Sequence, residues 1–313
     1  MSKILITGGL GFVGGRLSRR LSDEHEVYVS SRHEQTKEVL QLHGNVRLID
    51  HRNLLSPSTF PKSIDTVIHL AALNEWDSVK FPSEAIRVNV DETRILLENS
   101  INEHVGQFIY FSTAHIYGSP LVGQITEETL PVPVHPYAIT HRAAEDYIIA
   151  AAKQKKINGL VIRLSNAFGA PVHADVNRWT LLANDLCRQA IEKGKLTLLS
   201  NGCQYRDFIC LSDVEEIIAK LVTKTMRHIV YNLGSGVSTR VIDMANKISG
   251  FATELLKKNI PVVLPENSSV SNERELHYSI DRLVSEGLNL SNPVDPELKR
   301  LLQFCQLNFM GLD

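Results

Sequence analysis

Short apolar runs alternate with longer amphipathic segments through the first half of the chain. Each run is almost continuously hydrophobic, which is typical of parallel strands buried on both faces. Between the runs apolar residues recur at helical spacing, and Val13, Leu17 and Leu21 predict a helix over residues 13–22. The runs predicted as strands are, in chain order, KILITGG, HEVYVSSR, NVRLID, DTVIHLAA, QFIYFST and NGLVIRL.

This alternation predicts an α/β fold, a Rossmann-type doubly wound parallel sheet with helices on both faces. In the helix before the fifth strand, we expect an inner face formed by Ile86, Val90, Leu97 and Ile101. Another helix is expected to begin at Tyr137 and to lead into the sixth strand.

The regular alternation of apolar runs and amphipathic segments becomes less clear after about residue 166. Further strands are predicted at LTLLS, RDFICLSDV and IVYNLGSG, with helices near 179–193, 212–225 and 239–249. The last two apolar runs are expected to return to the main sheet. The remainder is expected to form a smaller lobe over the carboxyl edge of the sheet, where open α/β sheets bind ligands. The predicted division assigns residues 1–165 and 207–234 to the sheet domain, and 166–206 and 235–313 to the lobe.

Composition narrows the possible partners of this fold. The 313 residues include 33 basic and 35 acidic side chains, a balance that excludes the basic footprint of a nucleic-acid-binding protein. The four cysteines lie far apart without CxxC spacing, so neither a metal site nor a disulfide framework is predicted. The opening MSKILITGG is too short an apolar run for a signal peptide or membrane span. We therefore expect a cytoplasmic protein without a membrane partner.

The segment TGGLGFVG has the glycine spacing of a dinucleotide-binding turn between a strand and a helix. Gly8 permits the tight turn, Gly11 lets the backbone approach a pyrophosphate, and Gly14 lets helix and strand pack closely. Phe12 and Val13 then begin the helix whose amino terminus favours an anion. A glycine turn without a ligand is the alternative, but the strand before and the helix after favour a nicotinamide dinucleotide.

The end of the second strand indicates which dinucleotide is bound. An NAD site usually carries an acid there for the ribose 2′-hydroxyl. This chain has Ser31 and Arg32 instead, a hydroxyl and a planar cation suited to a 2′-phosphate. NADP is therefore favoured over NAD, although Arg32 pointing into water is the alternative. Asp50, which closes the third strand, is expected either near the adenine or as the cap of a turn.

Seven segments in order resemble the extended short-chain dehydrogenase/reductase family, the NAD-dependent epimerase/dehydratase group acting on nucleotide-linked sugars. The resemblance runs from residue 3 to about residue 240. The segments are TGGLGFVG, HLAA at 69–72, NVDETRILLE at 89–98, STAHIYG at 112–118, PYAITH at 136–141, RLSNAFG at 163–169 and YRDFICLSDV at 205–214.

The resemblance implies a catalytic pair. Thr113 matches the active Ser/Thr that bonds the reacting substrate oxygen, and Tyr137 matches the tyrosine that gives or takes its proton. A phenol with a pKa near ~10 needs a nearby cation to act as a base at neutral pH. In the family this cation is a lysine that also holds the nicotinamide ribose, but here the position is His141. Imidazole is shorter and largely neutral at pH 7, so weaker and more pH-dependent help to Tyr137 is expected.

His115 is the candidate for an additional acid or base. In family members that eliminate water or carbon dioxide, its position tends to carry a glutamate, and in the dehydratases an aspartate precedes it. Here the pair is Ala114–His115, which argues against a 4,6-dehydratase. A histidine bonded to a loop carbonyl is the alternative reading.

Other positions follow from the resemblance. Asn89 matches an asparagine that braces the active-site backbone, or it lies on a helix surface. Asn166 and Arg206 match contacts to the nucleotide diphosphate, although Asp207 could instead pair with Arg206. Arg274 is the nearest candidate for a further substrate arginine. The expected cofactor contacts from HLAA are Leu70, Ala71 and Ala72.

Three functions compete. The first is an NADP-dependent reductase of a keto group on a nucleotide-linked deoxysugar, and the second is a nucleotide-sugar epimerase without net redox change. The third is a non-catalytic NADP-binding regulator, favoured by His141 and opposed by the retained Thr113 and Tyr137. The resemblance also implies a homodimer through the helices beginning near residues 84 and 137, with which Ala143, Tyr147 and Ala151 are compatible.

Overall fold

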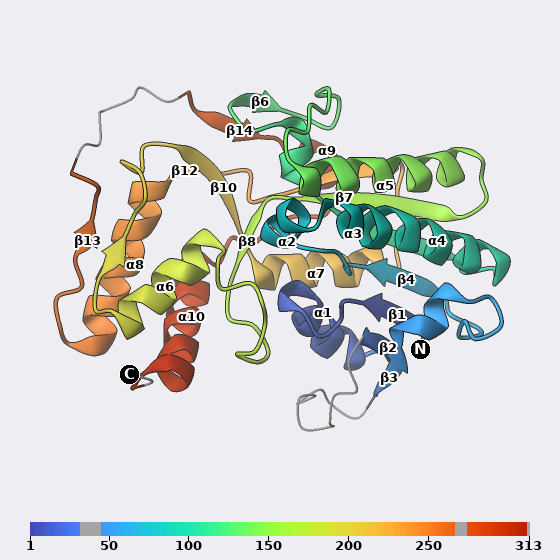
Figure 1. The fold of residues 1–313 in the computed structure, drawn as a ribbon, viewed down its shortest axis with the longest axis horizontal. Helices are drawn as coiled ribbons and strands as arrows, with labels where there is room; N and C mark the ends of the chain where they lie inside the picture. Colours follow the sequence, from blue (N-terminus) through green and yellow to red (C-terminus); the bar gives the residue numbers. More distant parts are fainter. Residues whose placement is uncertain (32–44, 267–273, 312–313) are drawn as a thin grey trace.

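The centre of the molecule is a seven-stranded parallel sheet (Figure 1). The computed structural model describes residues 1–31, 45–266 and 274–311. The strand order is β11-β7-β5-β4-β1-β2-β3, which confirms the predicted Rossmann-type fold. The order reverses between β1 and β4, and ligands of open α/β sheets bind at such a point. The strands are β1 (Lys3–Thr7), β2 (Glu26–Ser31), β3 (Val46–Asp50), β4 (Thr66–His69), β5 (Gln107–Thr113), β7 (Asn158–Leu164) and β11 (Val230–Leu233).

Helices bury both faces of this sheet, which explains why its strands are continuously apolar. Side chains alternate across a strand, so Ile4 and Ile6 face one core while Leu5 faces another. The first core includes residues of α1 (Phe12–Ser22) and α7 (Leu211–Leu221). The second includes residues of α4 (Thr93–Asn102) and α5 (Pro136–Lys153). Ala151, predicted at a dimer interface, packs instead into this second core.

The predicted inner face of the helix before β5 is partly wrong. Leu97 is buried as expected, but Ile86 is 57% exposed. Between α3 (Pro82–Ile86) and α4, residues Arg87–Glu92 form a π-helical segment, η3. Its wider turn shifts the register, so that regular 3.6-residue spacing no longer identifies one face. As a result Val88 and Asn89 face inward.

A second lobe stands beside the sheet and has its own core (Figure 1). Its three longest helices pack on one another, and Arg16 of α1 links it to the sheet by pairing with Glu297 at 3.0 Å and with Glu215 of α7 at 2.6 Å. The helices are α6 (Leu182–Glu192), α8 (Val241–Leu256) and α10 (Val294–Phe309), with β9 (Leu196–Thr197) paired to β13 (Val262–Val263).

Of the two apolar runs predicted to return to the main sheet, one joins it and the other does not. The run IVYNLGSG does so, because β11 pairs in parallel with β7. The run RDFICLSDV does not, since β10 (Tyr205–Cys210) pairs with β8 (Asn166–Phe168) and β12 (Ser238–Arg240). Phe208 and Cys210 enter the lobe core while Ile209 enters the α1–α7 core. A strand at this junction is as apolar as one in the main sheet, so periodicity could not separate them.

Shorter elements complete the chain. They are η2 (His51–Leu55), α2 (Glu75–Lys80), η4 (Ala114–Tyr117), β6 (Gly123–Ile125) paired with β14 (Leu276–Tyr278), and α9 (Asp281–Ser285).

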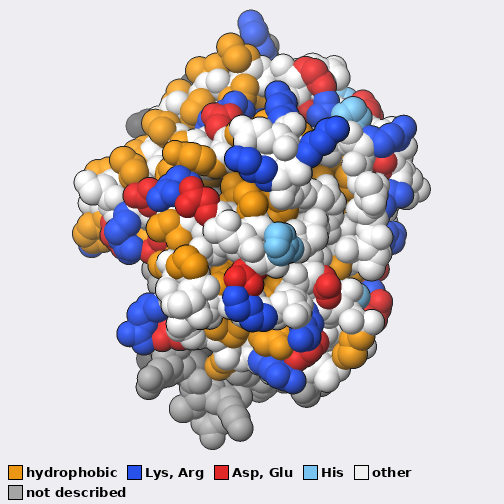
Figure 2. Space-filling model, turned by 90° about the vertical axis from the view of Figure 1, so that its right-hand side faces the viewer, with side chains coloured by type: hydrophobic (Ala, Val, Ile, Leu, Met, Phe, Trp, Pro, Cys, Tyr) orange, Lys and Arg blue, Asp and Glu red, His pale blue; other side chains and the backbone are white. Residues whose placement is uncertain are grey.

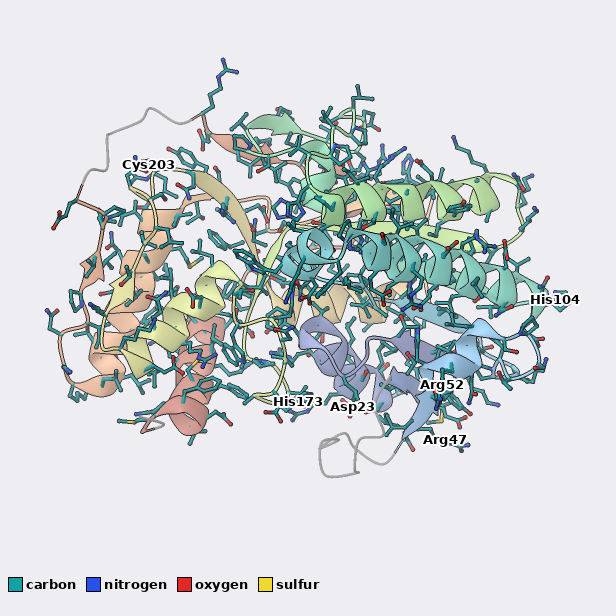
Figure 3. All side chains as sticks on the ribbon, in the orientation of Figure 1. Asp23, Arg47, Arg52, His104, His173 and Cys203 are labelled. Atoms are coloured by element: carbon teal, nitrogen blue, oxygen red, sulfur yellow. The ribbon has the colours of Figure 1, made fainter. Side chains whose placement is uncertain are left out.

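The surface carries charges of both signs. On the face shown in Figure 2, basic and acidic side chains are interspersed rather than gathered by sign. All four cysteines are free thiols, and Cys203 lies in the second lobe (Figure 3). Among the described residues no helix is long and apolar enough to cross a membrane, and no three His, Cys, Asp or Glu side chains are grouped to hold a metal ion.

Candidate active site

The glycine turn holds β1 and α1 in close contact. Gly8 has φ +66°, and a Cβ there would lie 3.0 Å from the backbone nitrogen of Ala71. A Cβ on Gly14 would lie 2.1 Å from the carbonyl oxygen of Gly8, a distance that no side chain tolerates. The glycine at each of these positions is therefore required by the backbone geometry. The turn brings the first residues of α1 against the loop after β4.

A cavity of about 440 Å³ runs from this turn across the switch point of the sheet. At its first end lies the amino terminus of α1, where the N-cap is Gly11, which has no side chain to cap the first turn. Free N–H groups and the helix dipole make this end suitable for a pyrophosphate. The predicted cofactor contacts that line the cavity here are Gly8, Gly11, Phe12, Val13, Gly14, Leu70, Ala71 and Ala72.

Three buried polar atoms along this cavity have no hydrogen-bond partner among the described residues. They are the Oγ atoms of Ser30 and Ser112 and the Nε2 of His141. Buried polar groups are nearly always hydrogen-bonded, so each unpaired atom indicates a ligand or water. Their spread along the cavity fits an elongated, hydroxyl-bearing ligand, as a dinucleotide is. The residues present therefore fit this cofactor.

The residues predicted to choose between NADP and NAD lie at the edge of what the structure describes. The side chain of Ser31 and all of Arg32 fall outside the described residues. Asp50 takes the alternative role foreseen for it and caps η2, accepting a hydrogen bond from the Arg52 nitrogen at 2.9 Å. Arg52 lies at the outer edge of the sheet near β3 (Figure 3), and the hydrogen bonds from its side chain and its backbone nitrogen lower the pKa of Asp50 to about 2. The ionisable residues that line the cavity near Asp50 are His51 and Glu92.

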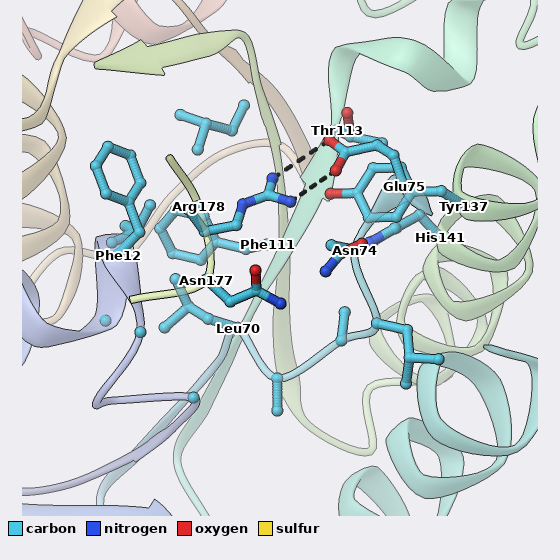
Figure 4. A pocket seen from close by; sticks show the side chains of 18 of the residues that line it. Phe12, Leu70, Asn74, Glu75, Phe111, Thr113, Tyr137, His141, Asn177 and Arg178 are labelled. Carbon is cyan, nitrogen blue, oxygen red and sulfur yellow. Dashed lines mark hydrogen bonds and ion pairs between the residues drawn. The ribbon is translucent and has the colours of Figure 1, made fainter. Parts of the chain in front are cut away.

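Thr113 and Tyr137 meet at the other end of the cavity (Figure 4). Thr113 ends β5, and Tyr137 stands in the first turn of α5, where His135 caps the helix by accepting from the Tyr137 nitrogen. The Thr113 hydroxyl lies near the Tyr137 hydroxyl (Figure 4) and favours its ionised form. Burial, reinforced by the charge of Glu75, raises the pKa of Tyr137 to about 12. At neutral pH Tyr137 is therefore a protonated phenol ready to donate.

His141 lies next to Tyr137 but brings no positive charge. Their rings meet edge to face with centroids 4.3 Å apart. The Nδ1 of His141 is hydrogen-bonded to the Tyr110 hydroxyl at 2.7 Å, and its buried Nε2 has no hydrogen-bond partner among the described residues. Burial lowers the pKa of His141 to about 4, so it is neutral at pH 7. The imidazole can orient a ligand by a hydrogen bond, but it cannot replace the charge of a lysine ammonium.

An ion pair over Tyr137 was not predicted from the sequence. Arg178, from the segment between β8 and α6, pairs with Glu75 at the start of α2, with 2.6 Å between Nη1 and Oε2 (Figure 4). The guanidinium also faces the Tyr137 hydroxyl (Figure 4), and its charge favours the ionised form of this phenol. Glu75 begins the short helix α2 and Arg178 lies in an irregular segment, and neither belongs to a motif or period that could have indicated it.

A second cavity of about 640 Å³ adjoins the first and shares with it Glu75, His115 and Asn166. Burial lowers the pKa of its lining residue Arg206. Arg206 donates to the Asn166 oxygen at 3.3 Å. Asp207, considered as its partner, accepts instead from Ser165 and from the backbone of Ser235 and Gly236. Arg206 thus presents a cation to this cavity.

The remaining predicted site residues divide into three cases. Asn89 braces the site, since its oxygen accepts from the Leu73 nitrogen at 2.7 Å and its amide donates to Thr140 at 3.0 Å. His115 lines both cavities, and burial lowers its pKa. Arg274 is exposed just before β14 and is not among the lining residues of either cavity.

The sheet order and the glycine turn define a Rossmann-type fold, and Thr113 and Tyr137 line the cavity at its switch point. Residues 4–234 match the family model described as NAD dependent epimerase/dehydratase family. The chain therefore belongs to the NAD-dependent epimerase/dehydratase family, which confirms the resemblance carried by its motifs.

Known proteins of several activities are similar to this chain. The dTDP-D-glucose 4,6-dehydratase of Mus musculus is 23% identical over 324 residues, which cover 98% of this chain and 89% of that protein. UDP-glucuronic acid decarboxylase 1 of Danio rerio is 29% identical over 258 residues, 79% of this chain and 60% of that protein. The solved UDP-glucuronic acid 4-epimerase from Bacillus cereus, in complex with UDP-glucuronic acid and NAD, has a TM-score of 0.81 at 23% identity, covering 97% of this chain and 99% of that one.

Proposed function

We propose that this protein is an NADP-dependent reductase that converts a keto group on a nucleotide-linked deoxysugar into an alcohol. The observation that carries this proposal is the protonated Tyr137 beside Thr113 at one end of a cavity whose other end is the glycine turn. The adjoining cavity with Arg206 supplies a place for the nucleotide diphosphate of the substrate, since Arg binds phosphate through paired hydrogen bonds.

Thr113, Tyr137 and His141 would each have a separate role in such a reduction. When bound, the reduced nicotinamide supplies a hydride, which is the electron pair that reaches the carbonyl carbon. The Thr113 hydroxyl would hold the carbonyl oxygen, and Tyr137 would give that oxygen its proton. The resulting phenolate regains a proton from solvent, so one ketone consumes one hydride and one proton. His141 would direct its unpaired Nε2 to the nicotinamide ribose.

The choice of reductase over epimerase rests on the residues at the end of β2 and directly after it. Ser31 and Arg32 offer no acid for a ribose 2′-hydroxyl, and NADPH is the usual reductant for net reductions. A 4,6-dehydratase is less compatible with this site, because Ala114 and His115 stand where that activity uses two acids.

The first experiment is to follow NADPH oxidation by the purified protein with a panel of 4-keto nucleotide sugars. Stoichiometric NADPH consumption with formation of the alcohol supports the reductase. Interconversion of two sugar epimers without added NADPH would assign the epimerase instead. Tight NADPH binding without turnover of any sugar would assign the regulator.

Replacing Arg206 tests the diphosphate subsite. The Arg206→Leu variant should raise KM for the nucleotide sugar roughly ten- to a hundredfold with little change in NADPH affinity, because a charge-assisted hydrogen bond contributes about 1.5–3 kcal/mol. Arg188→Leu, in an ion pair with Glu192 on α6, is the matched control and should keep the wild-type KM. An unchanged KM in Arg206→Leu would remove the diphosphate from this cavity.

We also propose a cytoplasmic homodimer. The outer surface of α3 and α5 carries the exposed apolar side chains Ile86 (57%), Ile139 (50%) and Tyr147 (44%), which a second copy would cover by two-fold symmetry. Sedimentation should give twice the chain mass of 35.0 kDa. The Tyr147→Glu variant should sediment as a monomer. A monomeric wild-type protein at micromolar concentration would contradict the dimer.

A further inference from the structure

The site lacks a cation where the family places its lysine, and His141 does not supply one. This imidazole is 3% exposed, bonded to Tyr110 on one side and unpaired on the other. A neutral donor of this kind can hold a ribose hydroxyl. It cannot stabilise the negative charge that Tyr137 acquires when it gives up its proton.

Arg178 reaches the same phenol from the opposite wall of the cavity. In Figure 4 its guanidinium faces the carboxylate of Glu75 and the neighbouring hydroxyl of Tyr137, while His141 is drawn beyond the tyrosine ring. The guanidinium donates to both carboxylate oxygens of Glu75, at 2.6 and 3.3 Å, and lies on the side of the cavity that faces the Tyr137 hydroxyl (Figure 4). Burial works against its charge, but Tyr137 and Glu75 raise the pKa of Arg178, so the cation is kept.

We propose that Arg178 supplies the positive charge that stabilises the phenolate of Tyr137, in place of the lysine that this chain lacks, and that Glu75 positions it. The proposal deepens the proposed reductase and rests on it for the role of the proton. A guanidinium suits this task, since it stays charged at every working pH and can serve a carboxylate and a phenol at once through its fork of N–H donors. The two tasks of the family's lysine are thereby divided between His141 and Arg178.

The groups facing the phenol predict opposite effects for the two members of one ion pair. Thr113 and Arg178 favour the phenolate, whereas the charge of Glu75 opposes it. Removing Arg178 should therefore raise the pKa at position 137, and removing the charge of Glu75 should lower it. A merely structural ion pair would not show this opposition, because losing either partner would loosen the same contact.

The test titrates the phenol directly in the full-length protein without cofactor or sugar. A difluorotyrosine at position 137, more acidic than tyrosine, is followed by fluorine NMR. Arg178→Met should raise its pKa by about 1 to 3 pH units, the effect of losing a close opposite charge. Glu75→Gln should lower it, and Arg178→Lys, which keeps the charge, should stay nearer the wild-type value. The exposed pair Arg240–Asp243 is the matched control, and Arg240→Met should change nothing.

A rescue variant separates electrostatics from folding. His141→Lys restores a cation at the family position and should offset most of the pKa rise in the Arg178→Met protein. An unchanged or lowered pKa in Arg178→Met would overturn the proposal, as would a shift of the same sign in Glu75→Gln. The titration is independent of the substrate, so a failed sugar assay beside opposite pKa shifts would reject the reductase while supporting the role of Arg178.

Discussion

Replacing Tyr137 with phenylalanine is expected to lower kcat for the keto sugar by about 10²–10⁴-fold, the usual contribution of one positioned acid or base. The change removes the hydroxyl that Thr113 and Arg178 both contact and leaves the ring against His141. NADPH affinity should change little. Stopped-flow measurement of the reduction step and fluorescence titration of NADPH binding report the two quantities separately.

The matched control for this variant is Tyr28→Phe. Tyr28 lies on β2, where its hydroxyl donates to Glu26 at 2.9 Å, so the same hydroxyl is removed outside the cavity lining. This control should keep the wild-type kcat. A fall of less than about tenfold in Tyr137→Phe would show that another group donates the proton, and His115 would be the next residue to replace.

The second large effect is expected for stability, from a buried ion pair behind the active site. Arg163 of β7 donates to both oxygens of Glu145 on α5, at 3.1 and 2.8 Å, and the two side chains are 3% and 0% exposed. Arg163→Met should lower the free energy of unfolding by about 3–5 kcal/mol, because it leaves the Glu145 charge buried without its closest partner. Chemical denaturation followed by circular dichroism measures this difference.

A surface pair provides the comparison. Arg94 and Glu98 are paired at 2.8 Å on α4, with side chains 32% and 56% exposed. Arg94→Met should cost only about 0.3–0.5 kcal/mol, since solvent screens exposed pairs along a helix. Equal losses in Arg94→Met and Arg163→Met would contradict the argument that burial sets the cost.

Predictions from the sequence succeeded where the signal was local. The apolar runs of the main sheet were located because a strand buried on both faces needs continuous hydrophobic residues. The sequence predictions did not assign β10 to the correct sheet, because its residues Phe208 and Ile209 enter two different cores. They also misplaced Ile86, because the π-helical turn of η3 shifts the helical register without changing which residues are apolar.

The site was predicted in the same uneven way. Thr113, Tyr137 and His141 were proposed because they lie in short motifs tied to the end of a strand or the start of a helix, and all three line the first cavity. The bracing role of Asn89 was also foreseen, and its two hydrogen bonds agree with it. Arg274 is exposed outside the lining of both cavities, in a region where the match to the family had already faded.

The sequence by itself determined the alternation of strands and helices, the glycine turn and the Thr113–Tyr137 pair, because each depends on residues that are neighbours along the chain. Only the tertiary structure decided which charge faces the tyrosine. Glu75 and Arg178 lie 103 residues apart and meet because the second lobe places its β8–α6 segment across the carboxyl edge of the sheet. A contact between two isolated polar residues leaves no period or motif in the sequence, so folding alone brings it about.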